Sequence, residues 1–143
     1  MNKLFIKRIT KNETKDLKSF ISNCGKSREM FSYFEKRSLD ILENHLLTLL
    51  LFKDSNSIGY GHLDKEAETV WLGICIIEKE LSKGYGKIIM KELLDFADQN
   101  KININLSVMK NNTIAYNLYK KFGFKKTKVD DLNFFMKRKF KEV

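Results

Sequence analysis

The hydrophobic and polar residues of this chain follow two different periods. Alternation of apolar and polar residues, or a short apolar run bounded by turn residues, is typical of a β-strand. By this criterion we expect seven strands, at residues 3–10, 45–52, 58–63, 69–77, 102–108, 124–129 and 132–140. Apolar residues that recur every three or four positions indicate helices instead. These are expected at residues 12–24, 28–42 (a broken helix), 84–100 and 112–122.

The order of these elements predicts the fold class. Three strands in a row precede the first helix that connects two strands. Consecutive strands joined by short turns pair antiparallel, whereas a strand–helix–strand unit pairs parallel. We therefore expect an α/β protein with a mixed, largely antiparallel central sheet of about seven strands, flanked by helices. Residues 1–143 are expected to form a single domain, because no linker or repeat interrupts them.

Composition excludes several classes of protein. A chain that is 43% hydrophobic and holds 11 Phe is not intrinsically disordered. No apolar run approaches the ~18 residues of a membrane-spanning helix, and the start of the chain does not resemble a secretory signal. Cys24 and Cys75 are expected to be reduced thiols of a cytoplasmic protein. No spacing of His and Cys fits a zinc site, so no metal is expected.

The net charge of +9 raises the question of a nucleic-acid partner. Residues 72–143 hold 15 Lys or Arg against 8 Asp or Glu, a surplus of seven, whereas residues 1–71 hold 12 against 10. A basic RNA-binding domain is one interpretation, but 23 of the 27 basic residues are Lys, and base recognition favours Arg. No aromatic or loop motif of the common RNA-binding modules is present. A bound anionic small molecule or a lysine-rich surface explains the asymmetry equally well.

A glycine loop between two predicted elements is the first candidate binding site. The segment Ser82-Lys83-Gly84-Tyr85-Gly86-Lys87 follows the strand at residues 69–77 and opens the next helix. Two glycines leave backbone N–H groups accessible, and the helix adds unpaired N–H groups and the positive end of its dipole. This suits a pyrophosphate. The pattern is neither of the common phosphate-binding motifs, and a tight structural turn is the alternative.

Asn112 and Tyr119 form the second candidate. Seven residues correspond to about two helical turns, so both side chains lie on nearly the same face. A tyrosine has an ordinary pKa of about 10, keeps its proton at neutral pH and can donate it. The structural alternatives are a helix N-cap for Asn112 and a core aromatic for Tyr119.

Together these motifs resemble the GNAT-superfamily N-acetyltransferases. The matching segments are Leu-Gly-Ile-Cys-Ile at 72–76, Lys-Gly-Tyr-Gly at 83–86 and Asn-Thr-Ile-Ala-Tyr-Asn-Leu-Tyr-Lys-Lys-Phe-Gly-Phe at 112–124. The match is close over residues 69–127, and the order of elements extends it to the whole chain. The resemblance implies that the fourth and fifth strands splay apart. It also implies direct transfer of an acetyl group from acetyl-CoA to a primary amine.

The resemblance further implies which residues hold acetyl-CoA. Pantetheine would bind along the fourth strand, the pyrophosphate would lie on the glycine loop, and Tyr119 would protonate the leaving thiolate. The expected cofactor residues are Ile74, Cys75, Ile76, Leu81, Ser82, Lys83, Gly84, Tyr85, Gly86, Lys87, Asn112, Ala115 and Tyr119. Leu81 departs from the family, which usually has Arg or Gln at this position, and a hydrogen bond that braces the loop is therefore in question.

The acceptor amine must lose a proton during the transfer. The fourth strand holds no internal carboxylate, only Glu68 and Glu78 at its ends. We expect His62 to be the base, because an ordinary pKa of about 6.5 suits the task and neighbouring glycines leave space around it. A strand-end Glu, Asp64, His45 and a water chain are the alternatives, and a purely structural His62 is another.

Acceptor recognition is expected near the aromatic and charged segment 30–37. The expected substrate residues are Phe31, Tyr33, Arg37, His62 and Trp71. In one hypothesis the segment is a lid that stacks on a nucleotide-linked amino sugar while Arg37 binds phosphate; packing against the core is the structural alternative. Other small amines and a peptide or protein amine are alternative acceptors, and a CoA-binding module without catalysis is an alternative function. A monomer or a homodimer is expected.

Overall fold

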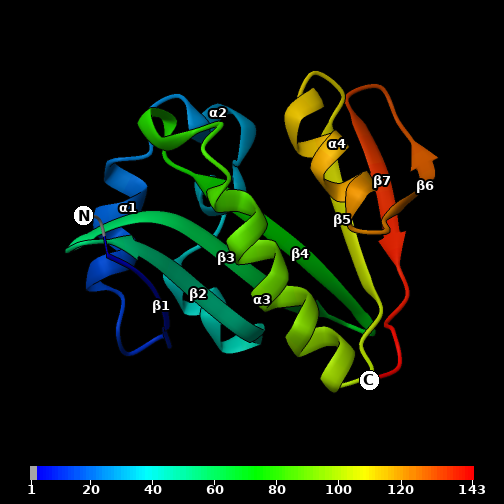
Figure 1. Cartoon of the computed structure of the whole chain (residues 1–143), viewed down its shortest axis with the longest axis horizontal. Helices are drawn as coiled ribbons and strands as arrows, with labels where there is room; N and C mark the ends of the chain where they lie inside the picture. Colours follow the sequence, from blue (N-terminus) through cyan, green and yellow to red (C-terminus); the bar gives the residue numbers. More distant parts are fainter. Residues whose placement is uncertain (1–2) are drawn as a thin grey trace.

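The computed structural model describes residues 3–143, and a seven-stranded sheet runs through it (Figure 1). The strand order is β1-β2-β3-β4-β5-β7-β6. The strands are β1 (Leu4–Arg8), β2 (His45–Lys53), β3 (Asn56–Glu66), β4 (Thr69–Ile76), β5 (Ile104–Met109), β6 (Lys125–Val129) and β7 (Asn133–Arg138). All pairs are antiparallel except β4 with β5. The expected mixed, largely antiparallel sheet is confirmed.

The helices cover both faces of the sheet. In Figure 1, α3 (Tyr85–Gln99) and α4 (Thr113–Lys121) lie in front, and α1 (Lys15–Ser22) and α2 (Ser27–Met30) lie behind. The remaining helical turns are short 3-10 segments: η1 (Tyr33–Glu35), η2 (Leu39–Asn44) and η3 (Glu78–Glu80). The expected broken helix at residues 28–42 is therefore a series of single turns. Every other predicted element lies within three residues of its observed bounds.

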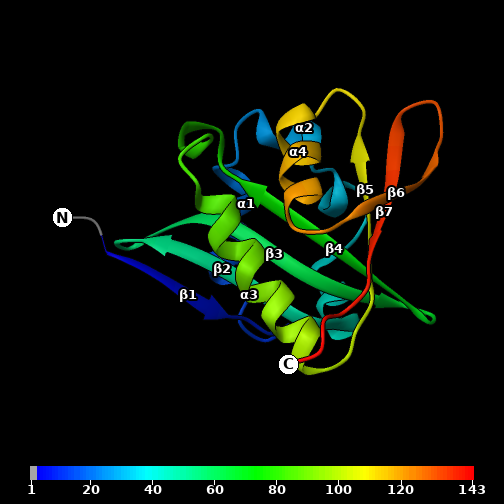
Figure 2. The same cartoon turned by 45° about the vertical axis from the view of Figure 1, so that its right-hand side comes forward.

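The sheet opens between β4 and β5. These two parallel strands pair at a single register position, Trp71 with Asn105. By contrast, β3 and β4 stay paired from Gly59–Ile76 to Glu66–Thr69. In Figure 1, β4 and β5 meet at the bottom and diverge toward the top, and Figure 2 shows the same opening from another side. The expected splay of the fourth and fifth strands is confirmed, and it leaves one edge of β4 without a neighbouring strand.

Glycines on β3 make room for a helix, which corrects one expectation. A Cβ atom at Gly59 would lie 2.7 Å from Ile89 Cδ1 of α3, so this residue allows α3 to approach the sheet closely. Gly59 and Gly61 point to the α3 face, whereas Tyr60 and His62 point to the opposite face. The glycines on β3 therefore do not provide the space around His62.

Within the described residues, no helix has the length and apolar character needed to cross a membrane.

Candidate active site

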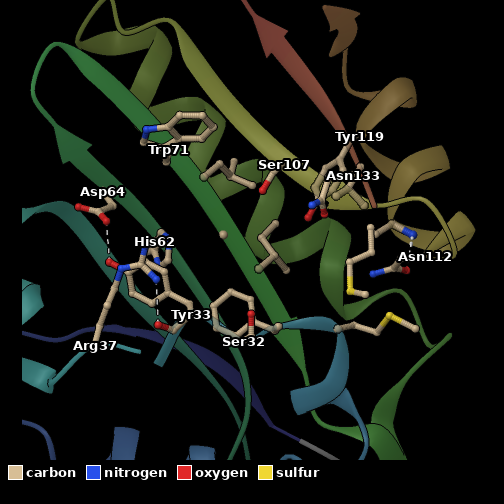
Figure 3. Close-up of a pocket in the computed structure, with 18 of the residues that line it drawn as sticks. Ser32, Tyr33, Arg37, His62, Asp64, Trp71, Ser107, Asn112, Tyr119 and Asn133 are labelled. Atoms are coloured by element: carbon tan, nitrogen blue, oxygen red, sulfur yellow. Dashed lines mark hydrogen bonds between the residues drawn. The ribbon is translucent and has the colours of Figure 1, made fainter. Parts of the chain in front are cut away.

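A cavity of about 270 Å³ opens where β4 and β5 diverge (Figure 3). Nine of the expected cofactor and substrate residues line it, together with the alternative base Asp64: Phe31, Tyr33, Arg37, His62, Trp71, Ile74, Asn112, Ala115 and Tyr119. All five expected substrate residues are among them. In Figure 3, Tyr119 and Asn112 lie across the cavity from His62 and Asp64. The fold thus unites residues separated by up to about ninety positions in the sequence.

Other expected cofactor residues lie outside this cavity. Cys75 is buried, and a hydrogen bond with Cys24 together with burial raises the pKa of its thiol. Ile76 is also buried, with its Cδ1 atom near Gly59. The segment from Leu81 to Lys87 lies at the start of α3, beyond the cavity wall. These positions are compatible with a long ligand that binds along β4 and reaches the loop.

The loop before α3 has the backbone shape of an anion site. Ser82 and Gly84 adopt positive φ angles of 63° and 86°. Gly84 is the N-cap of α3 and no side chain caps the helix, so the first N–H groups of α3 remain available to a ligand. A Cβ atom at Gly84 would meet nothing within 4 Å, which leaves this side of the loop open. The loop therefore fits a pyrophosphate.

A buried carboxylate that the sequence analysis missed supports this loop. Glu80 accepts hydrogen bonds from Lys53 Nζ at 3.2 Å and from Lys83 Nζ at 3.3 Å. Burial raises the pKa of Glu80, but the two lysines outweigh this effect and hold the pKa below its usual value. Lys83 therefore braces the loop through Glu80 rather than adding a free charge. The exposed Leu81 makes no such contact through its side chain.

Asn112 and Tyr119 form the α4 wall of the cavity. Asn112 Oδ1 accepts a hydrogen bond from the backbone N–H of Ala115 at 3.2 Å, so the residue caps α4 and also lines the cavity. Tyr119 is buried, and its ring packs against Phe124 with the centroids 5.8 Å apart. Burial raises the pKa of Tyr119. Its hydroxyl group therefore keeps its proton at neutral pH and can donate it.

A chain of hydrogen bonds holds Asp64 on the β3 wall. Tyr33 donates its hydroxyl proton to Asp64 Oδ2 at 2.6 Å (Figure 3). His45 Nε2 lies 2.7 Å from the same hydroxyl, and His45 Nδ1 lies 2.7 Å from Thr48 Oγ1. Burial lowers the pKa of His45 to about 4. With a neutral His45, every hydrogen bond of the chain has one donor and one acceptor. Thr48 donates to His45, His45 donates to Tyr33, and Tyr33 donates to Asp64.

His62 lies beside Asp64 on the same strand and is only 2% exposed. Burial, followed by the nearby His45 and Arg37, lowers its pKa well below 6.5, so the ring is neutral. Its Nδ1 lies 2.7 Å from the fully buried Tyr60 hydroxyl. The buried Tyr60 hydroxyl group needs an acceptor for its proton, and His62 Nδ1 is that acceptor. The hydrogen of the neutral imidazole is then on Nε2.

The space for this imidazole comes from β4. A Cβ atom at Gly73 would lie 2.6 Å from His62 Nε2 and 3.0 Å from Phe31 Cε1. Gly73 is the register partner of His62, so its missing side chain lets both rings rest on the backbone of β4. In the sequence, Gly73 had been noted only within residues 72–76, a segment that resembles the GNAT superfamily.

The aromatic segment at residues 30–37 packs against buried rings of β3, more closely than a mobile lid would. Phe31 lies 5.6 Å from Tyr60 and 6.1 Å from His62, between ring centroids. The Arg37 guanidinium lies 4.3 Å from the centre of the Tyr33 ring and donates to the Tyr33 carbonyl at 3.1 Å. Arg37 thus anchors η1 as well as lining the cavity. The segment combines its packing role with a place in the cavity wall.

Sequence reasoning missed several lining residues, among them Glu66, Gly73, Ser107 and Asn133. Ser107 belongs to a polar stripe on β5 that its alternation could have revealed. Asn133 reaches the cavity because β7 inserts between β5 and β6, a placement that no local pattern encodes.

Among residues 3–143, no group of three His, Cys, Asp or Glu is arranged to hold a metal ion.

The basic surplus is unevenly distributed along residues 72–143. Residues 72–109 hold five Lys or Arg and five Asp or Glu, and have no net charge. Residues 110–143 hold ten basic against three acidic residues, a net charge of +7. The surplus belongs to the part of the chain that contains α4, β6 and β7.

Comparisons with known proteins agree with this architecture. A model of the acetyltransferase (GNAT) family matches residues 12–124. The PaiA N-acetyltransferase of Thermoplasma acidophilum, solved with coenzyme A, is 22% identical, with 96% of this chain and 99% of that chain covered and a TM-score of 0.77. A GNAT-family acetyltransferase of Streptococcus pneumoniae is 18% identical, with 97% and 100% covered and a TM-score of 0.76.

The ribosomal-protein-S18-alanine N-acetyltransferase of Escherichia coli is 13% identical, with 99% of this chain and 96% of that chain covered and a TM-score of 0.75. The search of curated proteins finds no match. At these identities the solved structures establish the fold, whereas the family match spans most of the chain. The chain therefore belongs to the GNAT acetyltransferase family and is an N-acetyltransferase that uses acetyl-CoA.

Proposed function

We propose that the chain acetylates the primary amine of a small molecule that enters the cavity between Tyr119 and the pair His62 and Asp64. One observation carries this proposal: a single cavity holds a protonated hydroxyl group on one wall and a carboxylate on the other. Transfer of an acetyl group to an amine needs a proton donor for the leaving sulfur and an acceptor for the amine proton. The two walls offer both.

The opening in the sheet supports the proposed binding mode of acetyl-CoA. Because β4 and β5 pair only at Trp71 and Asn105, the backbone of β4 around Ile74 has N–H and C=O groups free to bind a pantetheine arm. The loop from Ser82 to Lys87 would hold the pyrophosphate through its N–H groups. When bound, acetyl-CoA supplies the reactive thioester. Asn112 and Ala115 would contact it from α4.

We assign the proton acceptor to Asp64 rather than to His62. The hydrogen bond from Tyr60 occupies His62 Nδ1 and leaves the hydrogen on Nε2, which makes the imidazole a donor toward the cavity. Asp64 is a carboxylate at the cavity wall, and Tyr33 holds only its Oδ2 atom. His62 remains the alternative base, and the pH experiment described in the Discussion separates the two.

The proposed reaction balances with the side chains present. The ammonium ion first gives one proton to solvent. The neutral amine nitrogen then bonds to the carbonyl carbon of the acetyl group and the carbon–sulfur bond breaks. Asp64 takes the proton that the amine loses, and the Tyr119 hydroxyl gives its proton to the departing sulfur. The products are an amide and a free thiol, and solvent returns the proton from Asp64 to Tyr119.

The charges of the cavity favour a cationic acceptor. Asp64 and Glu66 both line it, and the Trp71 ring offers a face that attracts a positive charge. Arg37 is the one basic side chain among the described lining residues. An amine therefore arrives as an ammonium ion next to carboxylates. Amino sugars, whether free or nucleotide-linked, belong to this class of acceptor.

A thiol-release assay tests the function. Purified protein and acetyl-CoA are mixed with free and nucleotide-linked amino sugars, polyamines, amino acids and short peptides. We expect steady release of thiol with at least one small amine, and loss of this release in Tyr119→Phe. Release with peptides alone would replace the small-molecule acceptor by a peptide amine. Acetyl-CoA binding by calorimetry without release for any amine would identify a non-catalytic CoA-binding module.

A further inference from the structure

The basic surplus of the chain gathers on one part of the sheet. Residues 110–143 carry the net charge of +7 described above. Every residue of β6, including Lys125, Lys126 and Lys128, is exposed, and so is Lys137 of β7. Figure 2 shows β6 and β7 as a hairpin at the outer edge of the molecule. The surplus is therefore a local surface feature rather than an average over the fold.

The lysines divide between the two faces of this hairpin. On the α4 face, Lys126 lies 4.6 Å from the Phe134 ring, and Tyr116 of α4 packs on the same ring. On the opposite face, Lys128 lies 5.6 Å from the Phe135 ring. Lys125 and Lys137 share this second face, because side chains alternate along each strand. In Figure 1, α1 and α2 lie over the other half of the sheet, and both of these lysines are exposed.

Lys125 and Lys137 are direct register partners on antiparallel strands. Like charges placed opposite each other in this way destabilise a sheet. None of the salt bridges within residues 3–143 includes either lysine. The pair thus retains two ammonium groups directed at solvent.

This lysine pair lies on the same face as the cavity. Ser107 of β5 lines the cavity and is the register partner of Phe135. Two positions further, Asn105 pairs with Lys137, and Lys137 pairs with Lys125. From strand geometry, Lys137 lies roughly 7 Å along the strands and 5 Å across from Ser107. Asp64, at the other wall, lies roughly 14 Å across the strands from Lys137, since β4 and β5 separate β3 from β7. An elongated small molecule can span this distance to the flexible lysine side chains.

We propose that Lys125 and Lys137 bind an anionic end of the acceptor, so that the acceptor is an amine with a phosphate or carboxylate group remote from its nitrogen. This inference rests on the proposed function. The ammonium end lies by Asp64 and Glu66, and the anionic end lies on the lysine pair. Charges of opposite sign at the two ends fix one orientation of the acceptor and reject amines that lack the anion.

Matched acceptors and variants test this inference. Glucosamine is compared with glucosamine 6-phosphate, and the peptide Ser-Ala-Asn-Asn with Ser-Ala-Asp-Asp, so that phosphate and carboxylate sources are separated. The variant is Lys125→Gln with Lys137→Gln. The control is Lys18→Gln with Lys91→Gln, which removes the same charge from exposed positions on α1 and α3. Thermal unfolding verifies that both variants are folded.

We expect the wild type to have a lower KM for the anionic member of at least one pair. The Lys125/Lys137 variant should raise that KM roughly tenfold, because charge-assisted hydrogen bonds are lost, while kcat and the KM of the neutral member stay unchanged. Added salt should reduce the preference in the wild type. The control variant should behave as the wild type.

Three outcomes overturn the proposal. If other amines are acetylated but neither anionic member is preferred, the lysine pair has no role in acceptor binding and the proposed function still stands. An equal loss of preference in the control variant would assign the effect to net charge instead of this site. If no amine is acetylated at all, the proposed function fails and this inference fails with it.

Discussion

The two walls of the cavity are built in opposite ways. On α4, Asn112 and Tyr119 belong to one helix, and Tyr119 needs only the packing of Phe124 to hold its ring. On β3, Asp64 is held by Tyr33, and Tyr33 in turn depends on His45. The α4 wall is thus encoded within one short segment, whereas the β3 wall needs several distant segments to arrive together. Substitutions should therefore act locally on the first wall and cooperatively on the second.

The largest expected effect comes from the α4 wall. Tyr119→Phe should lower kcat by about 100-fold or more, because it removes one proton donor and little else. The dissociation constant of acetyl-CoA should stay nearly unchanged, since the ring and its packing remain. Steady-state thiol release gives kcat, and calorimetry gives the dissociation constant. An unchanged kcat would remove Tyr119 as the acid.

The next effect separates Asp64 from His62 on the β3 wall. Asp64→Asn should lower kcat/KM about 10- to 100-fold, as expected for loss of a general base. His62→Gln should have a smaller effect and should leave the shape of the pH–rate profile unchanged, because His62 is neutral throughout the working range. The profile is measured for both variants and the wild type. A larger loss in His62→Gln, with an altered profile, would make His62 the base.

Gly73→Ala should disturb the β3 wall as a unit. The added Cβ would lie 2.6 Å from His62 Nε2 and 3.0 Å from Phe31 Cε1. Overpacking of this kind should lower the free energy of unfolding by about 1–3 kcal/mol, measured by denaturant titration. The double variant with His62→Ala is the control, because removal of the ring should make the added methyl group much less costly. Additive losses would contradict the proposed overlap.

The smallest expected effect is the pH dependence of stability from His45. Its pKa is about 4 in the folded protein and about 6.5 when unfolded. Between these values the unfolded chain binds more protons, so stability is complete above pH 6.5 and is lost as the pH falls toward 4. His45 should account for about 1–2 kcal/mol between pH 7 and pH 5. Unfolding of His45→Gln at both pH values measures its share, and an identical pH dependence in variant and wild type would contradict it.

The same contrast explains how far sequence reasoning reached. The α4 segment has a helical period, an N-cap and a motif, so Asn112 and Tyr119 could be placed on one face before the structure was known. The hydrogen bonds that connect Tyr33 with His45 and with Asp64 span 12 and 31 residues. No periodic pattern connects such positions. The network could not be predicted, although each of its members except Thr48 had been considered separately.

Charge and glycine patterns were the least reliable guides. A surplus counted over residues 72–143 conceals that the charge belongs to residues 110–143. The glycines next to His62 were expected to free space for it, but they face α3, and Gly73 on the neighbouring strand provides that space. Closeness in sequence was used for closeness in space, and alternate residues of a strand point to opposite faces.

The sequence by itself determined the elements, the mixed sheet and the family, because each depends on local periodicity and on contiguous motifs. Only the tertiary structure decided how the cavity residues come together and which side chains share protons. These depend on register and on packing between distant segments: the single β4–β5 pairing, the insertion of β7 beside β5, and the absence of a side chain at Gly73. Burial in that packing also set the protonation states of His45 and His62, because desolvation acts only after the chain has folded.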